Sequence, residues 1–229
     1  ADGDAISTLN FDAPTSSFSG NSPLGLTAVG DGFALLHNTA TENPDPDTTY
    51  TYSIRLDIYD NNDTIVASKI MNDQELSAPP ELSLNANGHI NILAEVIYSN
   101  QTDALGDAHS ETRAMVVTAE GELINNVLLT TTYSYFNTIS QAPNGNWLVS
   151  FEYGGPDSVA YAVLNSAGDL LAGPHLNTDH EPTEISSVVF PDGSFGAIFF
   201  EDESLVGNLQ CVSNAGNKVA SYTQFTGPI

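Results

Sequence analysis

The chain alternates short apolar runs with tight polar corners. In the stretch ISSVVFPDGSFGAIFFEDES, residues 185–204, two apolar runs flank a corner at Gly193 and are followed by acidic residues. Asp-Gly or Asn-Gly between apolar runs is typical of a β-hairpin, because both residues tolerate the positive φ that a type I′ turn requires. This corner occurs four times, at Gly32, Gly88, Gly145 and Gly193.

A second corner follows each first one, and the spacing of the corners predicts the architecture. These second corners are centred on Asn62, Gly121, Gly168 and Gly216, and successive first corners are 56, 57 and 48 residues apart. Two hairpin corners in each unit of about 50 residues give four strands per unit, which is the period of a β-propeller blade. We expect four such units, at residues 24–78, 79–136, 137–182 and 183–227.

The sequence therefore predicts an all-β, single-domain β-propeller of four blades, each with four antiparallel strands. Residues 1–23 are similar to the outer strand and connector that precede the later units, so they predict an extra N-terminal strand. Several runs, such as SSVVF and AIFF, are apolar on both faces, which suits sheets packed on both sides. A closed four-bladed ring fits the length, and a five-bladed ring, a fragment of a larger propeller or a β-sandwich remain alternatives.

The PDG or PNG corners and the later AGD or AGN corners resemble the blades of bacterial secreted β-propeller repeat proteins over about residues 24–225. The resemblance implies a secreted or cell-surface protein. It identifies no activity, because propellers serve as lectins, adhesins, scaffolds and enzymes.

Charge narrows the possible partners. Four Lys and Arg residues face 29 Asp and Glu residues, which gives a formal net charge of −25. Such a field repels phosphate backbones and anionic lipid headgroups, so it argues against nucleic-acid binding and membrane insertion. A lone Cys211 makes no intrachain disulfide, and we expect it in the core. The chain shows no signal peptide, so we expect either that one has been cleaved or that the sequence begins inside a longer chain.

The connections between units divide into two kinds, and only one kind is long. The tight corners fall at one end of a propeller, whereas the long, acid-rich connections all fall at the opposite end, where repeat proteins usually meet their ligands. Tyrosine rings beside polar groups there could form a platform for a sugar. The predicted ligand-binding residues are Tyr98, Asn100, Glu152, Tyr153, Asp157, His175, Asp179, His180, Glu201 and Asp202.

Acidic residues in the first two long loops are candidate ligands for Ca²⁺, because Ca²⁺ prefers oxygen ligands. Neither loop matches the twelve-residue calcium-loop motif, and on so acidic a chain such clusters also arise as ordinary solvated surface. The candidate ligands are Asp45, Asp47, Asp103, Asp107 and Glu111.

Carboxylates at the ends of equivalent strands raise the alternative of catalysis. A glycosidase needs two carboxyl groups on either side of the scissile bond, and Glu95, Glu152 and Glu201 lie 7, 7 and 8 residues after their corner glycines. The odd offset places Glu201 on the other sheet face, which argues against convergence. The favoured hypothesis is a secreted, non-enzymatic module that binds a glycan or protein surface, with Ca²⁺ as a candidate cofactor. The alternatives are a glycan-cleaving propeller that uses Glu152 and Glu201, and a structural segment of a larger adhesin.

Overall fold

The computed structural model describes residues 24–42, 50–72, 75–102, 108–132, 134, 137–153, 158–177, 182–201 and 207–225. These residues form seventeen strands, and this part of the chain contains no helix. The strands are β1 (Leu24–Val29), β2 (Gly32–Glu42), β3 (Tyr50–Tyr59), β4 (Ile65–Asn72), β5 (Glu75–Leu76), β6 (Glu81–Leu84), β7 (Ile90–Thr102), β8 (Ala108–Val117), β9 (Leu123–Thr130), β10 (Asn137–Gln141), β11 (Trp147–Glu152), β12 (Val159–Leu164), β13 (Leu170–Asn177), β14 (Pro182–Val189), β15 (Phe195–Glu201), β16 (Gly207–Val212) and β17 (Lys218–Phe225).

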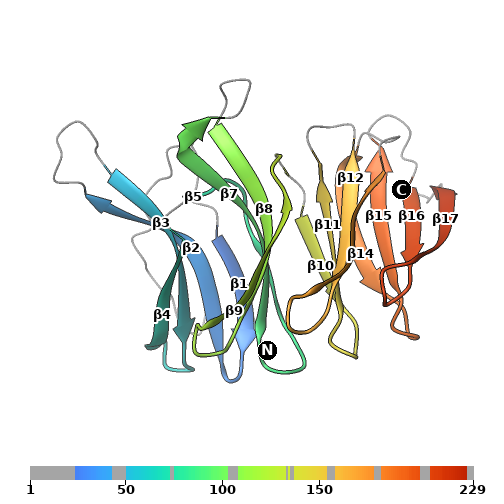
Figure 1. Ribbon diagram of the computed structural model, residues 1–229. Helices are drawn as coiled ribbons and strands as arrows, with labels where there is room; N and C mark the ends of the chain where they lie inside the picture. The colour runs from blue at the N-terminus through green and yellow to red at the C-terminus, as the bar shows by residue number, and fades with distance from the viewer. Residues whose placement is uncertain are drawn as a thin grey trace, which may run out of the picture.

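Four antiparallel sheets follow one another along the chain, and each pairs its strands in sequence order (Figure 1). We call them blades 1 to 4: β1–β4, β5–β9, β10–β13 and β14–β17. The prediction of four blades of four antiparallel strands is confirmed. Blade 2 differs in detail, because both β5 and β6 pair with β7. The expected extra strand within residues 1–23 lies outside the described residues.

The hairpin corners are where expected, but most are not type I′ turns. At a representative corner the Gly88 amide donates to the Asn85 carbonyl at 2.9 Å, and the Asn85 amide donates to the His89 carbonyl at 2.8 Å. Only the glycine has positive φ, so the loop has three residues, a type I turn closed by a left-handed glycine. The same arrangement recurs at Gly121, Gly145, Gly168, Gly193 and Gly216.

Two corners of blade 1 correct the sequence interpretation. In the first, the left-handed residue is Gly30 at φ 56°, not Gly32. Gly32 is required for space instead, because a Cβ there would clash with the Tyr59 carbonyl oxygen. In the second, Asp63 at φ 58°, rather than Asn62, takes the place of the glycine.

The core consists of apolar layers between successive blades. Leu36 and Leu56 of blade 1 pack on Ile92 and Val96 of blade 2, and the opposite face of blade 2 packs on Trp147, which is fully buried. A third layer joins blade 3 to blade 4 through Leu148, Tyr161, Val163, Phe195 and Ala197. Each middle blade is thus apolar on both faces, as the sequence predicts.

The blades form an open arc rather than the closed ring that the sequence favoured. Their first strands lie side by side around a common axis, with close contacts from β1 to β6, β6 to β10 and β10 to β14. Among the described residues no comparable contact joins blade 1 to blade 4, and the two lie at opposite ends of the arc (Figure 1). Each terminal blade therefore has one face that no other described blade covers.

Candidate functional site

The second strands of the four blades all run toward the same end of the common axis around which the blades are arranged (Figure 1). These strands are β2, β7, β11 and β15. The tight corners lie at the opposite end of this axis, and the long connections begin where these four strands finish. We call this the long-loop end. It is the end at which the sequence predicts a ligand site.

Near the end of β2, Asn38 binds the backbone of the connector that leads into blade 2. Its side-chain amide donates to the Leu76 carbonyl at 3.2 Å, and the Leu76 amide donates back to Asn38 Oδ1 at 2.8 Å. Asn38 is fully buried. The two bonds satisfy both polar groups of the side chain away from water and fix β5 beside blade 1.

Glu95 repeats this arrangement in blade 2. Its carboxylate Oε1 accepts from the backbone amide of Ser134, which belongs to the connector into blade 3, at 3.3 Å. Glu95 is only 1% exposed. Burial raises the pKa of this carboxyl, hydrogen bonds from Ser77, Ser134 and Ser110 oppose that shift, and the negative charge of Glu152 adds to it. We call a polar side chain that binds the next connector in this way a connector clamp.

Glu152 occupies the matching position in blade 3. It lies seven residues after Gly145, as Glu95 lies seven after Gly88, and it is 4% exposed. Its strand partner Val159 packs against Ile185 and Phe199 of blade 4. Glu152 is therefore placed between blades 3 and 4 at the long-loop end.

Glu201 is the last residue of β15 and pairs with Pro182. Its side chain lies outside the described residues. Blade 3 meets blade 4 through opposite faces of equivalent strands, since Leu148 on the face that carries Glu152 packs against Phe195 and Ala197 of β15. Odd offsets from the corner glycine in β11 and even offsets in β15 therefore face the same gap between the blades.

Glu111 lies in a charged cluster on β7 and β8, on the face of blade 2 that looks toward blade 1. Its carboxylate accepts from the Tyr98 hydroxyl at 2.6 Å and from Arg113 at 2.7 Å, and His109 lies at 3.4 Å. Burial alone would raise the pKa of Glu111, but the hydrogen bonds from Tyr98 and Arg113 and the Arg113 charge hold it below its usual value. Of the predicted site residues, the structure thus brings Tyr98 and Glu111 together, as partners of each other.

A related cluster lies on blade 1. Asp57, which is 2% exposed, accepts from Arg55 at 2.7 Å and lies 3.0 Å from His37 Nε2. Burial raises the pKa of Asp57, whereas hydrogen bonds from Ser68, His37 and Arg55 outweigh it and lower the pKa overall. Both arginines of the chain are therefore used to neutralise buried carboxylates.

The remaining predicted residues are dispersed. Tyr153 packs at the edge of the core between blades 2 and 3, and His175 lies on β13 with its ring 5.2 Å from that of Tyr161. Asn100 lies in β7, and its side chain is outside the description. The other expected ligand-binding and metal residues lie outside the described residues: Asp45, Asp47, Asp103, Asp107, Asp157, Asp179, His180 and Asp202.

Within the described ranges, no group of three or more His, Cys, Asp or Glu side chains could hold a metal ion. The Glu111 carboxylate is already engaged by Arg113, while calcium binding by the first two long loops stays a prediction. A search of the described residues for a helix long and apolar enough to cross a membrane found none.

Solved structures similar to this chain include several glycoside hydrolases. An α-L-arabinofuranosidase from Fusarium graminearum superposes with a TM-score of 0.50 at 11% identity, over 93% of this chain and 69% of that one. An exo-β-1,3-galactanase from Phanerochaete chrysosporium gives 0.46 at 12% identity, over 87% of this chain and 49% of that one. An endo-arabinase from Bacteroides thetaiotaomicron gives 0.41 at 10% identity, over 87% and 72%. This chain therefore spans about half the length of the galactanase.

The blade arrangement is that of a β-propeller, and the likeness to the arabinofuranosidase supports this fold. No family model matches the sequence, and no curated protein sequence matches it. The resemblance to bacterial secreted repeat proteins and the expected secretion stay predictions.

Sequence reasoning missed the connector clamps. Asn38 carries no catalytic signature, and Ser134 is an ordinary loop residue in the sequence. The available signal was positional, because Glu95 and Glu152 share one offset from their corner glycines. The partners of Asn38 and Glu95 belong to the next connector, 38 and 39 residues away along the chain, and no local pattern reports such a distance.

Proposed function

We propose that the protein acts on a glycan at the long-loop end and that it cleaves the glycan with Glu152 and Glu201 as the paired carboxyl groups. The observation that carries this proposal is the placement of Glu152 in the gap between blades 3 and 4, on the face that meets β15. Residues two apart in a strand share a face, and position 201 follows Phe199 by two residues. We therefore expect position 201 on the side of β15 that faces β11.

The similar solved structures support a glycan-acting protein more than the non-enzymatic adhesion module that the sequence favoured. The arabinofuranosidase is the basis for choosing the first substrates, short neutral arabino-oligosaccharides. A neutral substrate also suits a chain of net charge −25, because it meets no electrostatic repulsion. In such a site one carboxyl group protonates the leaving oxygen, and the other acts as base or nucleophile.

Glycan binding without cleavage is a second candidate, and the connector clamps favour it. Glu95 is buried and binds Ser134, so the matching Glu152 would hold the connector into blade 4 in the same way. In that case the carboxyl group supports the loops that contact the sugar and takes no part in bond breaking.

The two candidates differ in what Glu152→Gln changes. Purified protein is incubated with a panel of neutral oligosaccharides, products are separated by chromatography, and binding is measured by calorimetry. If the protein cleaves, Glu152→Gln and Glu201→Gln should each reduce the hydrolysis rate by about 10²–10⁴-fold, the usual contribution of a positioned acid or base, with the sugar still bound.

Glu122→Gln is the matched control, because Glu122 is 70% exposed beside Lys69 on a tight corner. Its rate should equal that of the wild type. Binding without products from the wild type would replace cleavage by the second candidate. If no sugar in the panel is bound or cleaved, the glycan proposal is wrong.

A further inference from the structure

The two terminal blades have uncovered faces whose equivalents inside the arc are packed interfaces. Blade 1 uses one face against blade 2, and blade 4 uses one face against blade 3. The other faces remain at the two ends of the arc (Figure 1). We call them the blade 1 end face and the blade 4 end face.

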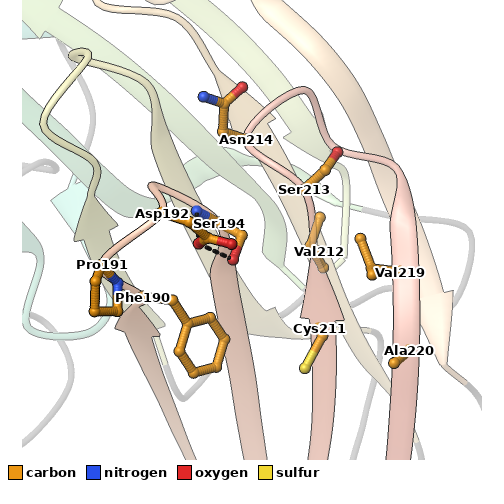
Figure 2. A pocket seen from close by; sticks show the side chains of 10 residues that line it. All are labelled: Phe190, Pro191, Asp192, Ser194, Cys211, Val212, Ser213, Asn214, Val219 and Ala220. Atoms are coloured by element: carbon orange, nitrogen blue, oxygen red, sulfur yellow. Dashed lines mark hydrogen bonds between the residues drawn. The ribbon is translucent and has the colours of Figure 1, made fainter.

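The blade 4 end face is apolar and hollowed. Figure 2 shows Phe190, Cys211, Val219 and Ala220 around this hollow, with Pro191 at its edge. Val219 is 65% exposed. Cys211, expected in the core, is only partly buried here, because it lies on the side of β16 away from blade 3. Burial raises the pKa of its thiol, so it behaves as an apolar residue of this face.

The blade 4 end face is structurally equivalent to the face of blade 3 that packs against blade 4. Leu148 and Tyr161 of blade 3 face blade 4 and are buried by it. The equivalent positions of blade 4, by offset from the corner and by strand pairing, are Gly196 and Leu209. Blade 4 thus repeats a surface built to receive another blade, although no described blade lies against it.

The blade 1 end face is the counterpart surface. Leu24 and Leu26 of β1 are 42% and 60% exposed, and Ile65 and Ile70 of β4, which pair with Tyr59 and Arg55, are 44% and 49% exposed. The Arg55–Asp57–His37 cluster lies between the apolar residues of β1 and those of β4. The corresponding face of blade 2 carries the Arg113–Glu111 pair and packs on blade 1. A neutralised ion cluster on this side of a blade is therefore compatible with blade-to-blade packing.

Charge distinguishes the end faces from the rest of the surface. The chain has a net charge of −25, yet the only acid described on the strands of the blade 1 end face is Asp57, which Arg55 neutralises. On the blade 4 end face, one described acid, Asp192, lines the hollow where it meets the corner. Depletion of charge around an apolar centre is typical of protein interfaces.

We propose that a second copy of this chain covers these faces, with the blade 4 end face of one copy packed on the blade 1 end face of the other. The contact continues the blade-to-blade packing already present three times within the chain. Because it joins two different surfaces, it is a head-to-tail contact, which extends or closes according to its rotation. The high negative charge of each copy opposes association, so added salt should strengthen it.

Analytical ultracentrifugation of the full chain over a range of concentrations and NaCl tests the proposal. The wild type should form dimers or larger species, with the dissociation constant falling as salt rises. Val219→Glu and Leu26→Glu should each weaken association by about tenfold or more, because each places a charge in an apolar contact. Ile124→Glu, on a 41% exposed residue of blade 2, is the matched control and should associate like the wild type.

Mixing the two variants identifies the head-to-tail geometry. Leu26→Glu retains an intact blade 4 end face, and Val219→Glu retains an intact blade 1 end face. Each alone should be monomeric, whereas an equimolar mixture should form a one-to-one dimer that grows no further. Ile70→Glu, on the same end face, replaces Leu26→Glu if circular dichroism shows that the latter is unfolded. A wild type that stays monomeric at all salt concentrations, or a mixture that stays monomeric, would overturn the proposal.

Discussion

At the scale of single residues, the corners of this protein are determined by one left-handed position each. Seven corners give that position to glycine, and the second corner of blade 1 gives it to Asp63, at φ 58°. A side chain in this region brings its Cβ close to the backbone, so glycine is the least strained occupant. The Asp60 carboxylate accepts from the amides of Asn62 and Thr64 and fixes the turn around it.

Replacing Asp63 by glycine should therefore stabilise the protein. We expect Asp63→Gly to raise the free energy of unfolding by about 0.5 kcal/mol, since relief of the left-handed strain exceeds the added freedom of the unfolded chain. Asn62→Gly is the control at the neighbouring position. It has no positive φ to relieve, so it should lower stability by roughly 0.5–1 kcal/mol. Urea denaturation of both variants measures the difference, and the reverse order would refute this account of the corner.

At the scale of elements, successive blades are joined by more than apolar packing. Asn38 and Glu95 bind the connectors that lead into blades 2 and 3. Corner glycines also allow neighbouring blades to approach closely. A Cβ on Gly168 of blade 3 would lie only 2.7 Å from the side chain of Val116 in blade 2. Blade order and spacing are thus specified by polar contacts at one end of each strand and by close backbone approach at the other.

Burial of Glu95 predicts a pH dependence of stability. Its pKa is raised in the folded state, chiefly by burial, so folding binds a proton between its unfolded and folded pKa values. The free energy of unfolding should fall as pH rises from about 4.5 through the folded pKa. Glu95→Gln cannot titrate, so its stability relative to wild type should increase over that window in urea denaturation at several pH values.

Asp57→Asn should show the opposite sign, because the pKa of Asp57 is lowered. Asp57 contributes stability above its unfolded pKa, and that contribution is lost as pH falls through the folded pKa. The wild type should therefore lose its stability advantage over Asp57→Asn in acid.

If the difference in stability between Glu95→Gln and the wild type did not vary with pH, the assignment of a raised pKa to Glu95 would be wrong.

At the scale of the whole molecule, the open arc and the strongly negative charge act together. Four basic residues against 29 acidic ones leave the folded chain under self-repulsion. Both arginines are engaged with buried carboxylates, so little positive charge remains to offset the acidic loops. Cations should therefore stabilise the fold by screening, and a specific calcium site would add to that effect.

Calcium and sodium separate the two effects. At matched ionic strength, bound calcium should raise Tm beyond the sodium value, by an amount equivalent to about 2.7 kcal/mol at a hundred times its dissociation constant. The double variants Asp45→Asn/Asp47→Asn and Asp103→Asn/Asp107→Asn should identify the loop that binds, since the relevant one loses the extra shift. Equal shifts with both salts, measured by calorimetry, would remove the calcium site.

The strands and their grouping into four blades could be predicted from the sequence. These features are local: a polar corner with a left-handed residue follows from turn chemistry, and runs that are apolar on both faces follow from packing between two neighbours. Only the tertiary structure decided that Gly32 is required for space, that Asn38 and Glu95 bind connectors, and that Glu152 lies in the gap beside β15. It also decided that the described blades form an arc with two uncovered faces. These properties depend on how one sheet is rotated against the next, and that rotation is set by side chains far apart in the sequence.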